Sequence, residues 1–330
     1  MVTAAALVYR LLYGGLLSRV PEASAVRIGQ TLLRALPVDR WPLFTVRDPR
    51  LAITLGGVRL PNPVILAAMY YDPVILSRAM GLGFGAVTTK SITRQPRPGH
   101  PLPNLIRVRT AAGPGLVNCN GFQNPGLAAF VASLGAVRRR VPLIVSVAGE
   151  SEEDYADLVS AVGPHADLVE LNISSPNTKL VYTWSTRPQQ LRAALERARR
   201  AARVPVIVKL SPDFPDDNEK AIIPAAVEAG IQVVNYGNAR RVEEARLSQG
   251  AGGLSGPEIF PATLDHVRRT RQRFGGALDI VGTGGVDAPD KALALLDAGA
   301  TAVGYFTGFI TRGPLLARRI CERLLARRGG

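Results

Sequence analysis

The chain has 330 residues, of which 47% are hydrophobic and 20% charged, which indicates a globular protein and not a disordered one, with one large α/β domain or two smaller ones. A net charge of +14 permits a nucleic acid, an anionic membrane surface or an anionic substrate as partner and does not choose among them. Cys119 and Cys321 follow no metal or redox spacing, which indicates a reducing compartment such as the cytoplasm. The three histidines are isolated from one another, so we expect no metal site.

The first 24 residues are apolar but are interrupted by Arg10 and by Gly14-Gly15, and no cleavage motif follows them. We therefore expect neither a cleaved signal peptide nor a membrane-spanning helix. Two interpretations stay open. The segment is either a helix pair lying on a membrane surface, which would place the protein at the inner face of the cell membrane, or a helix packed on its own domain.

A helical pattern follows at 23–36, "ASAVRIGQTLLRAL". Pro37, Pro42 and Pro49 come after it and predict a boundary near residue 45. We accordingly expect an N-terminal helical extension at 1–45 and a larger unit at 46–330.

The larger unit alternates between short apolar runs and helical patterns. The helical patterns include 188–202, 218–230 and 288–300, and the apolar runs lie at 63–68, 85–91, 142–149, 167–174, 204–211, 231–238, 278–285 and 301–308. Buried runs without polar alternation, each followed by a helix, are typical of a parallel sheet. Eight such units predict an α/β fold, a closed (β/α)8 TIM barrel, whose strand ends share one mouth.

The predicted strand ends carry small polar residues, glycines and two lysines. They are Lys90, Ser91, Ser146, the polar run 172–177, Lys209, Asn238, Gly284, Gly285, Thr307 and Gly308. On strands seven and eight of a barrel, "GTGG" and "FTGF" predict a phosphate cup, with a short helix beginning near Gly313-Pro314.

Lys209 ends the apolar run "VIVK". A lysine there can stabilise the negative charge that builds up on a reduced flavin ring. The alternative is that its side chain extends to solvent.

Several motifs in order resemble the dihydroorotate dehydrogenase family of FMN-dependent barrels. They are "NPVILAA", "PRPGHPLPNLIRV", "LVNCNGFQNPG", "LNISSPNT", "VIVKLSPD", "GGLSG", "GTGGV" and "YFTGFITRGP", within residues 50–325. The N-terminal helical stretch is similar to the membrane-associating extension of the quinone-using class. The resemblance implies FMN as cofactor, dihydroorotate and orotate as substrate and product, and a quinone as the electron acceptor.

The resemblance also implies roles for individual residues. The base would be Ser175, because the quinone-using class has serine where the soluble classes have cysteine, and Thr178 and Phe122 would orient it. Substrate contacts would come from Lys90, Asn118, Asn172, Asn177 and Asn238, although an Asn at a strand end also serves as a turn former. FMN contacts would come from Ala67, Ala68, Ser91, Ser146, Asn172, Lys209, Ser255, Gly256, Gly284, Gly285, Phe306, Thr307 and Gly308.

Two segments depart from the family pattern. The quinone-using class has a substrate-binding lysine after the first strand, where this chain has only Met69 to Pro73, and Lys90 is placed as in the soluble classes. Gly237 and Ala239 stand where hydroxyl residues usually flank Asn238, and Arg240-Arg241 follow. A site built for hydrogen bonds loses affinity when they are unmade, so another anionic substrate remains an alternative.

Two other functions compete with dihydroorotate oxidation. An RNA pyrimidine reductase similar to dihydrouridine synthases would use the same cofactor and suit the positive charge, but those enzymes carry a catalytic cysteine and a C-terminal helical RNA-binding domain. We expect no nucleic acid as partner. The third alternative is a flavin-binding protein without turnover, and the oligomeric state stays open.

Overall fold

The computed structural model describes residues 9, 15, 19–174, 188–211 and 216–328. Eight parallel strands close into a barrel in the order β10-β13-β14-β3-β4-β7-β8-β9, so the predicted fold class and all eight predicted strands are confirmed. Their bounds are β3 (Val64–Tyr70), β4 (Ala86–Thr89), β7 (Leu143–Val147), β8 (Leu168–Asn172), β9 (Val206–Leu210), β10 (Val233–Tyr236), β13 (Asp279–Thr283) and β14 (Ala302–Tyr305).

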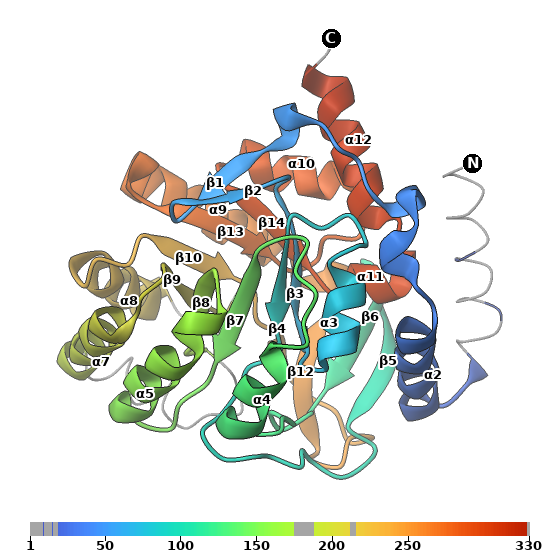
Figure 1. The fold of residues 1–330 in the computed structure, drawn as a ribbon, viewed down its shortest axis with the longest axis horizontal. Helices are drawn as coiled ribbons and strands as arrows, with labels where there is room; N and C mark the ends of the chain where they lie inside the picture. The colour runs from blue at the N-terminus through green and yellow to red at the C-terminus, as the bar shows by residue number, and fades with distance from the viewer. Residues whose placement is uncertain (1–8, 10–14, 16–18, 175–187, 212–215, 329–330) are drawn as a thin grey trace.

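Helices surround this barrel (Figure 1). They are α3 (Pro73–Ala79), α4 (Leu127–Leu134), α5 (Glu152–Val162), α7 (Pro188–Ala201), α8 (Asp216–Glu228), α9 (Phe260–Phe274), α10 (Pro289–Asp297), α11 (Thr307–Arg312) and α12 (Leu316–Arg328). The patterns at 188–202, 218–230 and 288–300 are confirmed as α7, α8 and α10. Short 3-10 turns are η2 (Val38–Arg40), η3 (Pro42–Phe44), η4 (Pro49–Leu51), η5 (Gly163–His165), η6 (Pro257–Ile259) and η7 (Gly275–Ala277).

The expected short helix after the last strand is displaced. It does not begin near Gly313: α11 starts at Thr307, immediately after β14, and α12 starts at Leu316. Gly313 has a φ of 91° and separates the two helices, because a glycine in the left-handed region ends a helix. The run 301–308 therefore contains a strand of four residues and the first residues of a helix.

The barrel interior is apolar at one end and polar at the other. At the amino end a cluster including Leu168, Ile207 and Val233 is closed by the hairpin of β1 (Ile53–Leu55) and β2 (Val58–Leu60). Alternate strand residues point the same way, so the residue two positions further along each of these strands also faces inward. These are Glu170, Lys209 and Asn235, all buried. The inward-facing residues of these strands thus change from apolar to polar within two positions of the apolar layer at the amino end.

A second, antiparallel sheet lies over the mouth, and the strand prediction missed it. It has the order β11-β12-β6-β5, with β5 (Leu105–Thr110), β6 (Gly113–Asn118), β11 (Arg240–Glu243) and β12 (Ala251–Ser255). The register pairs Gly253 with Asn118 and Ser255 with Leu116. This sheet therefore carries Asn118 and Ser255 to the mouth of the barrel.

The continuously described part of the chain begins at residue 19, and its first helix is α2 (Glu22–Ala35), which confirms the predicted helix at 23–36. The helix is tied to the barrel by an ion pair of 3.0 Å between Arg34 and Asp72. It leaves apolar side chains exposed at Ile28, Leu32 and Leu36. In the part of the chain that the structure covers, no helix combines the length and apolarity that crossing a membrane requires.

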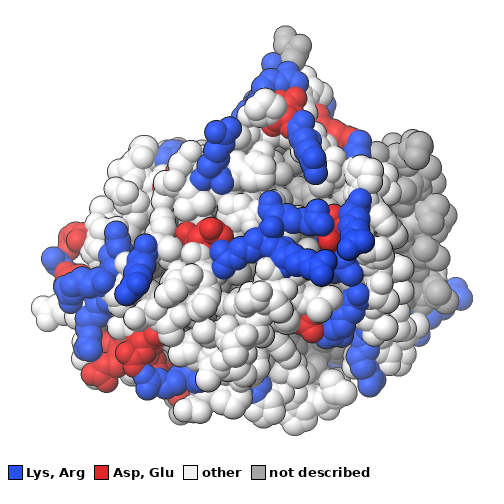
Figure 2. Space-filling view, in the orientation of Figure 1, with Lys and Arg blue, Asp and Glu red and all other residues white. Residues whose placement is uncertain are grey.

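Charged side chains are spread over the surface. Figure 2 shows Lys and Arg side chains gathered in a band across the middle of one face, with acidic side chains beside them. Several arginines form ion pairs, including Arg327 with Asp297 at 2.7 Å and Arg318 with Glu322 at 2.7 Å. The first of these pairs joins α12 to α10, and the second lies within α12.

Candidate active site

A pocket opens at the carboxyl ends of the barrel strands. It is lined by sixteen residues expected from the sequence, which are Ala67, Ala68, Lys90, Ser91, Asn118, Phe122, Asn172, Lys209, Asn238, Ser255, Gly256, Gly284, Gly285, Phe306, Thr307 and Gly308. Ser146 does not line it, because its side chain lies deeper and contacts Ser91 instead. Ser175, Asn177 and Thr178 lie outside the described residues.

The pocket wall also includes residues that were not predicted from the sequence as site residues. They are Asn120, Gly121, Gly253, Ile259, Thr283, Val286, Asp287 and Tyr305, together with Met69, Gly237 and Ala239 from the two segments that depart from the family pattern. Asn120 and Gly121 belong to the motif "LVNCNGFQNPG", so the motif itself was the signal for them. Gly253 belongs to the motif "GGLSG", so a motif was again the signal, whereas Ile259 lies in the turn η6 after the second sheet and is brought to the pocket only by the tertiary structure.

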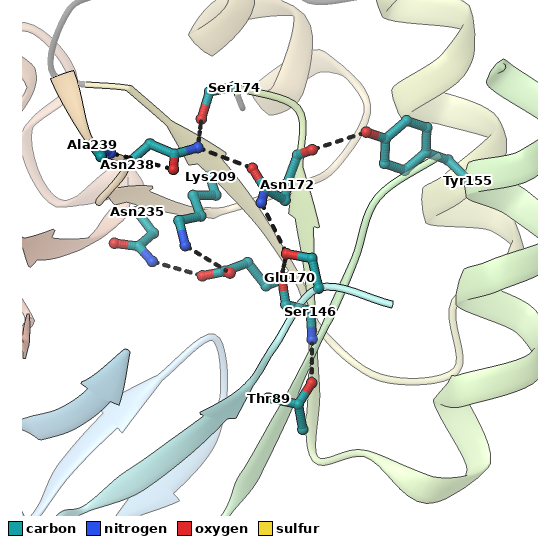
Figure 3. A network of polar contacts seen from close by, with 11 residues as sticks. Thr89, Ser146, Tyr155, Glu170, Asn172, Ser174, Lys209, Asn235, Asn238 and Ala239 are labelled. Atoms are coloured by element: carbon teal, nitrogen blue, oxygen red, sulfur yellow. Dashed lines mark hydrogen bonds and ion pairs between the residues drawn. The ribbon is translucent and has the colours of Figure 1, made fainter. Parts of the chain in front are cut away.

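A chain of hydrogen bonds runs through the centre of the site (Figure 3). Asn172 Nδ2 donates to Ser91 Oγ at 2.9 Å, and Ser91 Oγ is 2.9 Å from Ser146 Oγ. Asn172 Oδ1 accepts from Asn238 Nδ2 at 3.1 Å, and Asn238 Nδ2 also donates to Ser174 Oγ at 3.0 Å. The carboxamides of Asn172 and Asn238 are therefore fixed in orientation by their neighbours.

This network limits what each carboxamide can offer to a ligand. Both N–H bonds of Asn238 are used by Asn172 and Ser174, so only its Oδ1 has capacity left beyond the 3.3 Å contact from the amide of Ala239. Asn172 keeps one N–H and one lone pair. The Tyr155 hydroxyl donates to the main-chain oxygen of Asn172 at 2.9 Å, which holds the end of β8 in place. Asn172 can thus present a donor and an acceptor, whereas Asn238 can present an acceptor.

The structure explains why a glycine stands at position 237, where the family usually has a hydroxyl residue beside Asn238. A Cβ at this position would lie 2.5 Å from the Cβ of Thr283, so a larger residue requires that threonine to move. Thr283 is buried and lines the pocket from β13. Thr283 thus fills the space next to Gly237 with its Cβ and its methyl group, whereas its hydroxyl lies toward Gly304.

Lys90 stands at the end of β4, where its side chain enters the pocket wall. Burial lowers its pKa from 10.5 to about 8. Among the described residues no carboxylate forms an ion pair with it within 4 Å. A partly buried cation without a counter-charge is suited to bind an anion.

Lys209 enters the pocket from β9 and has a buried partner. Its ammonium is 3.5 Å from Glu170 Oε1, and the exposed fractions of the two side chains are 6% and 1%. Asn235 Nδ2 donates to Glu170 Oε2 at 2.7 Å. Lys209 does not extend to solvent, so the alternative interpretation of this residue is wrong.

The loop after β6 carries Phe122 in a constrained conformation. Phe122 has a φ of 55°, which is uncommon for a residue with a side chain. Asn124 Nδ2 donates to the main-chain oxygen of Phe122 at 2.6 Å, and His100 Nδ1 is 2.8 Å from the main-chain oxygen of Cys119. Such outliers concentrate at ligand sites, where the surrounding contacts hold them in place.

The last two strand ends form a cup of main chain. Gly284 and Gly285 have φ angles of 129° and 73°, and a Cβ at Gly308 would lie 2.2 Å from the main-chain oxygen of Val286. The first amides of α11 have no acceptor within the helix, and Thr307 Oγ1 donates to Ser255 Oγ at 2.9 Å. Close-packed glycines and free amides fit the terminal phosphate of a nucleotide cofactor.

An acidic side chain beside the cup is neutralised. Asp287 is 2.8 Å from Lys291 and 2.5 Å from Arg312. Burial would raise the pKa of Asp287, but hydrogen bonds from Lys291 and Arg312 outweigh it and leave the pKa below its usual value. The three side chains together carry one positive charge, which is compatible with a phosphate nearby. No group of three His, Cys, Asp or Glu that could hold a metal occurs among the described residues.

Comparisons with known proteins agree with this geometry. A family model described as dihydroorotate dehydrogenase matches residues 50–327. The "Dihydroorotate dehydrogenase (quinone)" of Cereibacter sphaeroides is 36% identical over 295 residues, covering 84% of this chain and 82% of that protein. The protein of the same name from Kineococcus radiotolerans is 33% identical over 360 residues, covering 99% of this chain and 98% of its own length.

A solved structure is also similar along the whole chain. The dihydroorotate dehydrogenase of Eimeria tenella, crystallised in complex with ferulenol, aligns with a TM-score of 0.82 at 26% identity and covers 98% of this chain and 96% of its own. The family model matches most of the chain, and the two relatives with this name exceed 30% identity over most of their length. The chain therefore belongs to the dihydroorotate dehydrogenase family, whose members are flavin-dependent.

Proposed function

We propose that this protein oxidises dihydroorotate to orotate in pyrimidine biosynthesis, with FMN as its flavin and a quinone as the final electron acceptor. The observation that carries the proposal is the hydrogen-bond chain from Ser91 through Asn172 to Asn238, which presents oriented carboxamide groups in a pocket that two lysines also line. A flat ring with alternating donors and acceptors and one carboxylate matches such a wall.

FMN would be held by the polar and glycine residues around the cup. Gly284, Gly285 and Gly308 leave room for a phosphate beside free amides, while Lys209 and Ser91 face the interior above the barrel floor. When bound, the flavin supplies the two-electron oxidant for the reaction. The positive charge of Lys209 would stabilise negative charge that accumulates next to it.

The protein would bind the substrate through its carboxylate and its ring. Lys90 would pair with the carboxylate, in place of the lysine that Met69 to Pro73 lacks, and Asn118, Asn172, Asn177 and Asn238 would bind the ring. Ser175 would remove a proton, oriented by Thr178 and Phe122. A weak base such as serine requires a site with little water, which bound flavin and substrate would provide by filling the pocket.

Quinones dissolve in membranes, and α2 offers a surface for contact with one. Ile28 and Leu32 are 40% and 49% exposed and lie four residues apart on one side of α2, and Leu36, directly after the helix, is 40% exposed. We include in the proposal that residues 1–45 are an extension that places the protein peripherally at the inner face of the cell membrane. The barrel would then be the unit at 46–330.

Leu32→Glu is expected to reduce binding to anionic phospholipid vesicles by about 10- to 100-fold, because burying a leucine side chain contributes about 1.5–3 kcal/mol. Co-sedimentation with phosphatidylglycerol vesicles measures this. The matched control is Leu102→Glu, an exposed leucine outside α2, which is expected to bind as the wild type does. Equal binding of both variants contradicts the role of α2.

The enzymatic proposal is tested by purifying the protein, identifying its bound flavin and measuring dihydroorotate oxidation with a soluble quinone, with fumarate and with NAD. Turnover with the quinone alone is expected. Bound FMN without turnover on dihydroorotate overturns the proposed reaction. Turnover with fumarate or NAD but not with the quinone overturns the proposed acceptor and leaves the reaction standing.

A further inference from the structure

Glu170 is a buried carboxylate that does not line the pocket. It points into the barrel from β8, one step below Asn172, and its side chain is 1% exposed. Its partners are Lys209, which lines the pocket, and Asn235, which does not. Among the described residues, Glu170 therefore contacts the pocket lining through Lys209 (Figure 3).

The Glu170 carboxylate is incompletely satisfied. Oε2 accepts one hydrogen bond from Asn235, whereas Oε1 has the 3.5 Å ion pair with Lys209 and no hydrogen bond from any residue that the structure describes. The Oδ1 atom of Asn235 is also buried without a hydrogen-bond partner. A buried ion pair contributes little net stability compared with packed apolar residues, and buried polar atoms without partners add about 1–3 kcal/mol of cost. Stability alone does not account for the arrangement.

The charges around the pocket show what Glu170 does. The charged side chains among the described lining residues are Lys90, Lys209 and Asp287. Asp287 is paired with Lys291 and Arg312, and Lys90 has no carboxylate partner in the described residues. Glu170 is the group that offsets the charge of Lys209, and it does so from the side of Lys209 that faces away from the pocket.

We propose that Glu170 is a positioning residue that aims the Lys209 ammonium and offsets part of its charge, and thereby keeps the midpoint potential of the flavin low enough for transfer of electrons to the acceptor. The inference rests on the proposed binding of FMN. A lone cation beneath the ring would stabilise the negative charge of the reduced flavin, which favours oxidation of the substrate and disfavours the second half of the cycle. The Glu170–Lys209 pair thus sets a flavin potential that serves both oxidation of the substrate and reoxidation of the flavin.

The test is the midpoint potential of the flavin in the purified holoenzyme, measured by dye-coupled titration. Glu170→Gln is expected to favour reduced over oxidised flavin at least tenfold, which for a two-electron couple is an upward shift of about 30 mV. Glu170→Asp keeps the charge and is expected to shift the potential by less than half as much. In stopped flow, Glu170→Gln is expected to slow flavin reoxidation by the quinone while flavin reduction by dihydroorotate is not slowed.

A purely structural role would lower the melting temperature without moving the potential. Asp39→Asn provides that comparison, because Asp39 is also buried and is paired with Arg78 and with Arg140, the latter at 3.0 Å, yet it lies outside the pocket. This variant is expected to be less stable with an unchanged potential. If Glu170→Gln does not retain FMN, the smaller upward shift expected of Glu170→Asp decides. Because Glu170 acts through Lys209, Lys209→Met/Glu170→Gln is expected to have the same potential as Lys209→Met.

The outcomes separate the two proposals. Bound FMN with the same potential in Glu170→Gln and wild type, or a higher potential in Lys209→Met/Glu170→Gln than in Lys209→Met, overturns the action of Glu170 through Lys209 and leaves the proposed function standing. Wild-type protein that binds no flavin overturns the proposed function and this inference together. Flavin that binds without dihydroorotate turnover overturns the proposed reaction, and the potential still decides the role of Glu170.

Discussion

Lys90→Met is expected to weaken binding of orotate by roughly 10- to 100-fold while FMN stays bound. Lys90 lines the pocket, and no described carboxylate pairs with it, so its charge is available to the carboxylate of the substrate. A hydrogen bond to a charged group contributes about 1.5–3 kcal/mol, and about 1.4 kcal/mol corresponds to a factor of ten in affinity. The measurement is titration of the flavin absorbance with orotate in wild type and variant.

The same lysine predicts a pH dependence. Burial lowers the pKa of Lys90 to about 8, so in the free protein its cationic form predominates below that pH and is lost above it. The substrate carboxylate stays ionised throughout this range, so affinity for orotate is expected to be constant below pH 8 and to fall by up to about tenfold per pH unit above it. Lys90→Met is expected to show no such fall.

Lys220→Met serves as the matched control, because Lys220 is exposed on α8 and does not line the pocket. It is expected to bind orotate as the wild type does at every pH. Orotate affinity in Lys90→Met equal to that of wild type at pH 7 would remove Lys90 from substrate binding and reopen the search for the group that replaces the lysine missing at Met69 to Pro73.

The barrel could be predicted from the sequence because each strand buries both faces. Runs such as 142–149 and 204–211 are apolar without alternation, which is the pattern of a parallel strand between helices and barrel interior. The second sheet lacks that signal. Its strands "GPGLVN" and "AGGLS" are rich in glycine, and pairing between residues far apart in the chain, such as Gly253 with Asn118, supplies their stability.

The pocket followed from the barrel because parallel strand ends converge, so most of the predicted residues could be placed together without knowing any distance. Glu170 could not be recognised in this way. In "DLVEL" it looks like a polar interruption of an apolar run, and its meaning depends on Lys209 and Asn235 from the two strands that follow. The depressed pKa of Lys90 likewise depends on burial by surrounding elements, which no local pattern records.

Ser175→Ala is expected to retain FMN and to slow flavin reduction by dihydroorotate by about 10²- to 10⁴-fold at neutral pH, the range over which a positioned general base contributes. Ser175 lies outside the described residues, so its role rests on the family motif "LNISSPNT" and on the residue before it. Ser174 is buried, and its Oγ accepts a hydrogen bond from Asn238, so its hydroxyl is engaged in the network that orients the carboxamides. Stopped-flow reduction without an acceptor isolates the affected step.

Ser174→Ala is the matched control, since it removes a hydroxyl from the neighbouring position. Losing the 3.0 Å hydrogen bond to Asn238 is expected to cost about 0.5–1.5 kcal/mol and to appear mainly as weaker orotate binding, because Asn238 is then less firmly oriented. The two variants are thus expected to differ in their effect: Ser175→Ala lowers the rate of proton removal, and Ser174→Ala lowers the affinity for orotate. Loss of rate in Ser174→Ala with an unchanged reductive step in Ser175→Ala would assign the base to the first serine of the pair and reverse the roles taken from the family.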